Sequence, residues 1–198
     1  MTVGDPLALV MGLAVIGAPL LLAVVWCVVA YNRLVNLRNM ISESWSNVDT
    51  ELRRRYDLIP NLVNTVKAYA AHERTVLEAV TEARSRAMQA VGGTEVQAQE
   101  ENQLVRALRS LLAVTEAYPN LKADQSFLQL QHELVNTEDR IQAARRFFNG
   151  NVRDYNNLVE TFPSSIVAGM FRFRRRQFFE IEEAVARAVV SVGFQPSA

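Results

Sequence analysis

The sequence predicts an all-α protein, in which an N-terminal transmembrane helix is followed by an antiparallel bundle of three to four long helices. Three observations lead to this prediction. An uncharged run of 25 residues stands near the N-terminus, from Leu7 to Tyr31. After it, apolar residues recur every three or four positions, and no strand-like alternation of useful length appears. Glycine is scarce, at 8 of 198 residues, so helices can be long.

The run from Leu7 to Tyr31 is predicted to cross a membrane, because a helix of that length rises about 37 Å and the hydrocarbon core measures roughly 30 Å. A signal peptide would need positive charge before the run, yet the only charged side chain there is Asp5. Arg33 and Arg38 follow the span and no basic side chain precedes it. The positive-inside rule therefore predicts a short outer N-terminus and a cytoplasmic C-terminal domain.

The first helix after the span is predicted from a regular apolar face. This face comprises Leu34, Leu37, Ile41, Trp45, Val48 and Leu52. Pro60 interrupts the pattern, so a kink or a restarted helix is expected there, with Asp57 as its cap. The pattern then continues to Gly92-Gly93, which ends the segment.

A second helix is expected to start at Thr94, where Thr94 and Gln97 match a capping box, and to end at Pro119. Its apolar face is Leu104, Leu108, Leu111, Leu112 and Thr115.

A third helix is expected from about 122 to 149, with Gly150 as its C-terminal cap. Its face is a regular heptad-like repeat of Phe127, Leu130, Leu134, Thr137, Ile141, Ala144 and Phe148. A shorter fourth helix covers 151–161, and 178–192 is the last expected helix. Short loops between these helices indicate antiparallel packing.

Four regions follow from this pattern. They are a short outer N-terminus at 1–6, the transmembrane helix at 7–31, the helical bundle at 32–161 and an Arg/Phe-rich segment with a final helix at 162–198.

The composition and motifs argue against an enzyme, a metal site and a cofactor. The single cysteine excludes an intrachain disulfide and a cysteine-based zinc site. His132-Glu133 begins like a zinc-protease motif, but Asn136 stands where the second histidine is needed. Nucleophile-elbow, P-loop and dinucleotide-binding patterns are absent from the sequence. Three adjacent acidic pairs are expected on solvated helix faces: Glu100-Glu101, Glu138-Asp139 and Glu182-Glu183.

Two arginine groups are the candidate sites for anions, although 21 basic and 21 acidic residues disfavour a dedicated polyanion binder. In the first, Arg53, Arg54 and Arg55 cannot share one helix face. At least one must therefore point to the bundle or to a partner. Recognition of an anion near a restarted helix end at Pro60 is one interpretation. Ion pairing with acids of adjacent helices is the favoured one.

The second group interleaves arginine and phenylalanine, and its candidate contact residues are Phe171, Phe173, Arg172, Arg174, Arg175 and Arg176. Three interpretations stay open. The segment could contact anionic lipid, or nucleic acid through phosphates and stacking, or simply pack its phenylalanines on the bundle. Nucleic acid is the least favoured of the three.

Two sequence blocks show a family resemblance. One reads Arg54-Arg55-Tyr56-Asp57-Leu58-Ile59-Pro60-Asn61-Leu62-Val63, followed by Lys67, Tyr69, His72-Glu73 and Glu82-Ala83-Arg84. The other comprises Tyr155-Asn156, Phe162-Pro163-Ser164 and Phe178-Phe179.

Together with the span, these blocks resemble the LemA family of bacterial membrane proteins over about 31–183. The dense arginines at 172–176 depart from the usual pattern. The resemblance implies one membrane helix and a cytoplasmic helical bundle, with no catalytic residue to transfer. Arg54, Arg55, Asp57, Pro60 and Asn61 form the candidate structural site of the motif.

The sequence therefore favours a non-enzymatic scaffold or homo-oligomeric interaction protein, anchored in the bacterial inner membrane. Its expected partners are the bilayer, a second copy and an unidentified membrane or cytoplasmic protein. One alternative is an enzyme or an enzyme-accessory subunit in membrane protein quality control. Another is a binder of anionic lipid or nucleic acid through the arginines at 172–176.

Overall fold

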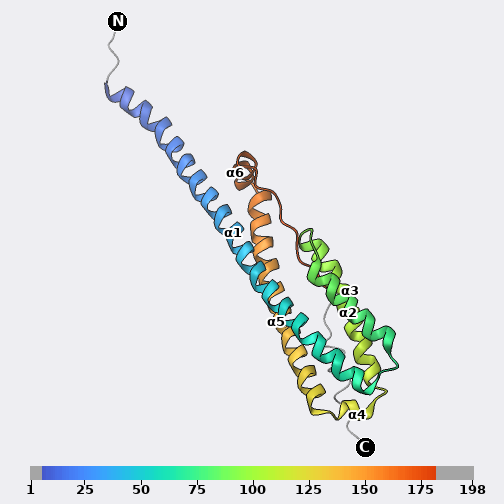
Figure 1. Ribbon diagram of the computed structural model, residues 1–198. Coiled ribbons are helices and arrows are strands. Elements are labelled where there is room, and N and C mark those ends of the chain that lie inside the picture. Colours follow the sequence, from blue (N-terminus) through green and yellow to red (C-terminus); the bar gives the residue numbers. More distant parts are fainter. Residues whose placement is uncertain (1–5, 182–198) are drawn as a thin grey trace, which may run out of the picture. The chain divides into compact units, whose positions relative to one another are not determined.

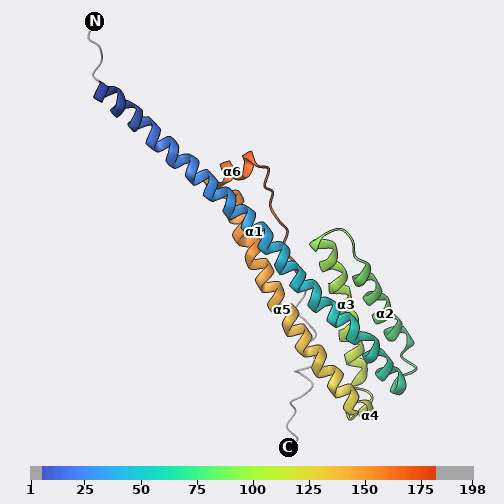
Figure 2. The same cartoon turned by 60° about the vertical axis from the view of Figure 1, so that its left-hand side comes forward.

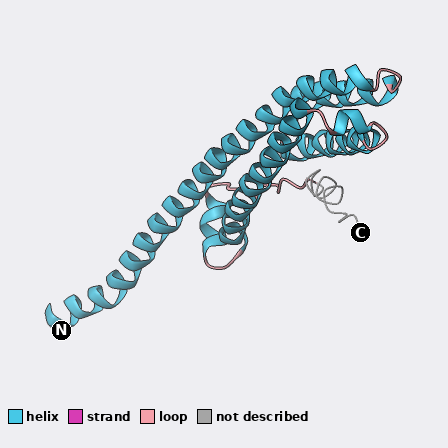
Figure 3. Cartoon of the chain, turned by 90° about the horizontal axis from the view of Figure 1, so that it is seen from below, coloured by secondary structure: helices cyan, strands magenta, loops and turns pink. Residues whose placement is uncertain are grey.

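The computed structural model describes residues 6–181, and this part of the chain is helical without strands (Figures 1 and 3). The helices are α1 (Pro6–Tyr69), α2 (Arg74–Gln89), α3 (Thr94–Thr115), α4 (Pro119–Lys122), α5 (Gln125–Glu160) and α6 (Ser164–Met170). The predicted all-α class is confirmed. The expected outer N-terminus before Pro6 and the expected last helix from residue 182 onward lie outside the described residues.

α1 is one uninterrupted helix of 64 residues, so the apolar run and the first bundle helix are a single element. The expected restart of a helix at Pro60 is wrong, because a contact from α2 lets α1 continue. Proline has no N–H, which leaves the carbonyl of Tyr56 without its helical donor. The Nε of Arg84 in α2 donates to that carbonyl at 2.7 Å. Because a side chain replaces the missing donor, the helix continues, and neither a restarted terminus nor a cap at Asp57 exists.

The chain turns after Tyr69 instead, through Ala70–Glu73. Two tyrosines fix this turn to the connection between α3 and α5. The hydroxyl of Tyr69 donates to Asp124 at 2.9 Å, and that of Tyr118 donates to Glu73 at 3.2 Å. The position of the break is thus set by contacts between segments far apart in the sequence.

α3 begins at Thr94 as predicted, but the predicted capping box is wrong. Gly93 precedes the helix with φ of +99°, and no side chain caps it. Gly92 has φ of +142°, so both residues occupy backbone conformations that favour glycine. The side chain of Gln97 is used elsewhere, in the polar cluster described below.

α5 combines the predicted third and fourth helices. Asp124 accepts a bond from the backbone N–H of Phe127 at 2.9 Å and caps the start of the helix. Gly150 was expected to end a helix, but it lies inside α5 with an ordinary negative φ. Residues 178–181 were assigned to the last helix and are non-helical.

The chain divides into two compact units, which are described separately. The bundle unit comprises 42–150 and 177–198; the span unit comprises 1–41 and 151–176. In the bundle unit, α2 and α3 form a hairpin beside the parts of α1 and α5 that belong to it (Figure 2). Its core includes Val48, Leu52, Ile59, Leu62, Val66, Val80, Leu104, Leu108, Leu111, Phe127, Leu134 and Ile141.

The span unit contains the start of α1, the end of α5, α6 and the segment up to Arg176. In α1, large apolar side chains are exposed over several turns: Leu20, Leu21, Leu22, Val24, Val25, Val28 and Val29. By length and composition, α1 is able to cross a membrane, and only 6% of its apolar window is buried. A core helix of a soluble protein would instead be mostly buried.

Candidate functional site

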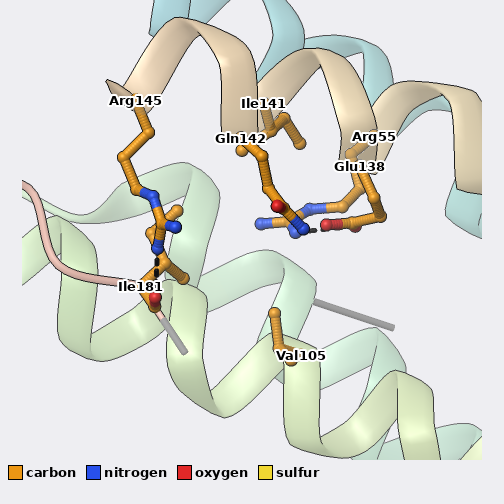
Figure 4. Close-up of a pocket in the computed structure, with 7 residues that line it drawn as sticks. All are labelled: Arg55, Val105, Glu138, Ile141, Gln142, Arg145 and Ile181. Atoms are coloured by element: carbon orange, nitrogen blue, oxygen red, sulfur yellow. Dashed lines mark hydrogen bonds and ion pairs between the residues drawn. The ribbon is translucent and has the colours of Figure 1, made fainter. Parts of the chain in front are cut away.

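A buried ionic cluster lies in the bundle unit, and Figure 4 shows two of its residues, Arg55 and Glu138. Arg55 of α1 is 0% exposed, and its guanidinium contacts one carboxylate from each of two other helices. Nη2 donates to Glu101 of α3, and Nη1 donates to Glu138 of α5 at 2.8 Å. One arginine therefore connects three helices, and of the three adjacent arginines it is the one directed into the bundle.

Tyr56 and Gln97 extend this cluster. The hydroxyl of Tyr56 donates to Glu101, and the amide of Gln97 donates to the same carboxylate at 2.8 Å. The same amide nitrogen lies 3.1 Å from the Tyr56 hydroxyl and 3.0 Å from the carbonyl oxygen of Ala87. We call Arg55, Tyr56, Gln97, Glu101 and Glu138 the Arg55 cluster.

Ion pairs and hydrogen bonds between its side chains stabilise the charges of the Arg55 cluster. Burial disfavours the charged form of Arg55, but the neighbouring Glu138 and Glu101 outweigh it and raise the pKa of the guanidinium. Burial, reinforced by Glu101, also raises the pKa of Tyr56. At neutral pH, Arg55 is therefore a cation and Tyr56 a neutral hydrogen-bond donor.

Glu101 and Glu138 were expected on solvated faces, and that prediction is wrong: both are buried, while Asp139 is exposed and Glu100 half-buried. A signal was present in the sequence. Glu101 lies three residues before Leu104, in register with the apolar face of α3. Glu138 lies between Leu134 and Ile141, in register with that of α5. A charge on a core face indicates a buried partner.

A small cavity adjoins the Arg55 cluster (Figure 4). It is lined by Arg55, Val105, Glu138, Ile141, Gln142, Arg145 and Ile181, and leaves about 10 Å³ for solvent. That volume suits about one water molecule and no organic substrate. Arg145 donates to the carbonyl oxygen of Ile181. Within 6–181, no group of three His, Cys, Asp or Glu side chains could hold a metal ion.

The other residues of the predicted motif site are not brought together with Arg55. Arg54 is exposed and lies 3.7 Å from Glu51 on its own helix. Asp57 and Asn61 are exposed, and Pro60 is half-buried. The residues of the motif thus have different roles. Arg55 is buried and forms ion pairs, Pro60 leaves the Tyr56 carbonyl to be bound by Arg84, and the others lie on the surface.

The Arg/Phe segment lies in the span unit. The ring of Tyr31 contacts the rings of Phe171 and Phe173, with centroids 4.7 and 5.7 Å apart. The guanidinium of Arg38 lies 5.7 Å from the Phe173 centroid, which is within the range of a cation–π contact. Both phenylalanines therefore contact the end of the apolar run.

The four predicted arginines of this segment are exposed: Arg172, Arg174, Arg175 and Arg176. Arg172 has φ of 58° where the chain leaves α6. Arg175 pairs with Glu160 at 2.9 Å. The side-chain amide of Asn156 accepts a hydrogen bond from the backbone N–H of Arg176 at 2.8 Å and donates one to its carbonyl oxygen at 2.9 Å.

A second asparagine binds the chain in the same way in the bundle unit. The amide of Asn149 contacts the backbone N–H and C=O of Phe179 at 2.9 and 3.0 Å. The ring of Phe179 is buried against Trp45 with centroids 5.1 Å apart. Sequence periodicity did not indicate these asparagine contacts with the backbone of Arg176 and Phe179.

A long helix with an unburied apolar part, continuous with a helical bundle, defines a membrane-anchored helical-bundle protein. The chain belongs to the LemA family, whose model matches residues 44–194. The resemblance drawn from the Asp57–Val63 block is therefore confirmed.

The chain is similar to magnetosome proteins and to a protein named LemA. Magnetosome protein MamQ 1 of Paramagnetospirillum magneticum is 24% identical over 179 residues, covering 78% of this chain and 66% of the relative. MamQ of Magnetospirillum gryphiswaldense has the same identity and coverage. Protein LemA of Metamycoplasma hominis is 25% identical over 153 residues, covering 77% and 69%. The chain thus spans about two thirds of the length of these relatives.

Proposed function

We propose that this protein is a non-enzymatic scaffold of the bacterial inner membrane, which acts by binding a second copy and other proteins. The Arg55 cluster carries the proposal. Arg55 and Tyr56 of the family motif are buried, and they bind Glu101 and Glu138 across α1, α3 and α5. Their chemistry holds helices together, and the adjoining cavity has room for about one water molecule.

The continuous α1 supports a scaffold role. Span and bundle share one helix, so the chain passes directly from the proposed membrane anchor into the bundle. We propose that the N-terminus lies outside and the bundle in the cytoplasm, since Arg33 and Arg38 follow the span. Protease protection in sealed vesicles checks this sidedness, because only inside-out vesicles should then expose the bundle to protease.

Exposed apolar side chains outside the span offer positions at which to test for partners. Phe147 is an exposed aromatic residue on α5, and aromatic residues are enriched at protein interfaces. A photo-crosslinking residue in place of Phe147, in native membranes, is expected to give adducts with a second copy or another protein. The matched control replaces exposed Arg153 on the same helix. Recovery of monomers alone at both positions and with a general amine crosslinker would contradict the proposal.

The enzyme alternative has a separate test. His72, His132 and Glu133 are the residues that the sequence offers for chemistry, and both histidines are exposed. We expect the purified full-length protein to show no hydrolytic activity on peptide, ester or phosphate substrates. An activity that disappears in the triple alanine variant would overturn the scaffold proposal.

A further inference from the structure

α6 has apolar side chains on both of its faces and no charged residue. Ser164, Val167 and Ala168 are buried and form its inner face. On the outside, Ile166 is 57% and Met170 69% exposed, and the flanking Phe162 and Phe171 are 80% and 53% exposed. Large apolar side chains that gather on an exposed surface are typical of a contact with a membrane or a protein rather than with water. We call Phe162, Ile166, Met170 and Phe171 the α6 surface.

The α6 surface lies at the end of the apolar run. Within the span unit, Phe171 follows α6 directly and its ring contacts Tyr31, the last residue of the run. Figures 1 and 2 both show α6 beside α1. Tyrosine is enriched where membrane helices leave the hydrocarbon core. This contact therefore brings α6 to the depth of the lipid headgroups.

Basic residues border the α6 surface on two sides. Arg33 and Arg38 follow Tyr31 on α1, and Arg172 and Arg174 follow Phe171. All four are exposed, and the contact of Arg38 with Phe173 links the two pairs. Apolar side chains beside arginines suit a surface in which acyl chains lie below negative headgroups. A soluble protein partner would not explain why these residues gather where the span ends.

We propose that the α6 surface is a second membrane contact, which inserts into the headgroup region of the leaflet from which α1 emerges at Tyr31 and binds anionic phospholipid. This inference rests on the membrane anchoring in the proposed function, but not on the scaffold role. The four apolar side chains enter the interface, and Arg172 and Arg174 contact lipid phosphates. The contact fixes the tilt and rotation of α1, because it adds a second point of attachment to the same bilayer.

Depth-dependent quenching of a fluorophore tests the insertion. In the full chain with Cys27→Ala, Ile166→Cys is labelled with an environment-sensitive dye and reconstituted into vesicles of phosphatidylcholine and phosphatidylglycerol. The matched control is Arg153→Cys, an exposed position on α5 in the same unit. We expect a blue-shifted emission at 166 and severalfold stronger quenching by lipids that are spin-labelled near the headgroup. Equal, water-like emission at both positions would overturn the proposal.

The double variant Ile166→Asp/Met170→Asp supplies a second readout, with Ser165→Cys as the labelled position. Both replaced side chains are exposed, so the helical circular dichroism and the melting temperature should stay unchanged while the dye becomes exposed to water. If the quenching at 165 is the same with and without the two aspartates, the apolar contact is disproved.

The anionic component is tested with Arg172→Gln/Arg174→Gln. Each basic residue near an anionic surface changes the bound-to-free ratio about fivefold. We expect dye insertion at 166 to decrease in this variant in vesicles with phosphatidylglycerol, and to be unaffected in phosphatidylcholine alone. An equal effect in both lipids would refute the choice of anionic lipid. A blue shift of the dye emission with RNA and without lipid would refute it as well. Crosslinking to proteins at Phe147 is independent of these outcomes, so the two proposals can fail separately.

Discussion

Two arginine groups of similar composition have opposite environments. Arg53, Arg54 and Arg55 precede an apolar helical stretch, and Arg55 alone is fully buried, between two carboxylates from other helices. The arginines at 172–176 follow a short helix and are exposed. The local density of charge therefore does not decide burial. Register with the apolar face does, because a side chain on that face is enclosed whatever its charge.

Removal of the buried charge of Arg55 is expected to have the greatest effect on stability. Arg55→Met leaves Glu101 and Glu138 buried without a cation, and we expect it to cost about 3–5 kcal/mol of unfolding free energy. Denaturation of the full chain in detergent micelles, followed by circular dichroism, measures it. Arg54→Met is the matched control and should change stability by less than about 0.5 kcal/mol. Similar losses in both variants would contradict the ionic role of Arg55.

A rescue separates lost charge pairing from lost packing. The triple variant Arg55→Met/Glu101→Leu/Glu138→Leu removes all three charges, and we expect it to recover most of the stability lost in Arg55→Met. A triple variant as unstable as the single one would show that packing around the guanidinium is decisive.

The next effect concerns the carbonyl of Tyr56 that Pro60 leaves without a helical donor. Arg84→Met removes the replacing donor, which we expect to cost about 1–3 kcal/mol. Pro60→Ala restores a backbone N–H at that position. In the double variant, the cost of Arg84→Met should therefore become smaller, which a double-mutant cycle of unfolding free energies measures. Additive costs would disprove this link between Pro60 and Arg84.

An alkaline pH dependence is expected from Tyr56. Its folded pKa is raised by burial and by Glu101, so the folded protein retains a proton that the unfolded chain loses above about pH 10. Stability is complete below that pH and decreases above it, by at most about 1.4 kcal/mol per pH unit. Tyr56→Phe lacks this proton, and unfolding curves between neutral pH and pH 11 should show a weaker alkaline loss. The same pH slope in both proteins would exclude Tyr56 as the source.

Replacement of an exposed arginine at 172–176 is expected to change the unfolding free energy least. Arg174→Gln should change the unfolding free energy in detergent by less than about 0.5 kcal/mol, because an exposed charge gains little from folding. The same denaturation experiment measures it. A loss comparable to that of Arg55→Met would remove the contrast between the two groups.

Sequence periodicity predicted the helices better than their ends. It placed the apolar face of α3, because that spacing is local, whereas the start at Thr94 was predicted from a capping box that the structure lacks. It misplaced the breaks at Pro60 and Gly150. A proline in a helix is tolerated where another segment supplies the missing donor, and a glycine where the helix is held on both sides by packing. Such support comes from residues far away in the sequence.

The candidate site was predicted in part. The sequence indicated that one of three arginines must face inward. The partners of Arg55, Glu101 and Glu138, each belong to a pair of adjacent acids, and such pairs predict solvated positions. The position of each acid relative to the apolar face of its own helix indicates burial instead. Both acids are in register with the leucines and the isoleucine of their own helices, and this register predicts that they are buried. The asparagine contacts of Asn149 and Asn156 have no such signal, because they bind backbone atoms of a non-helical segment.

The helical class, the apolar run long enough to span a bilayer and the family motif follow from the amino-acid sequence alone. These properties depend on composition and on spacing along one helix. The burial of one arginine, the continuation of α1 through Pro60 and the position of α6 beside Tyr31 require tertiary contacts. Each of these depends on a donor, a carboxylate or a ring brought from another helix, and hydrophobic periodicity carries no information about which segments will meet.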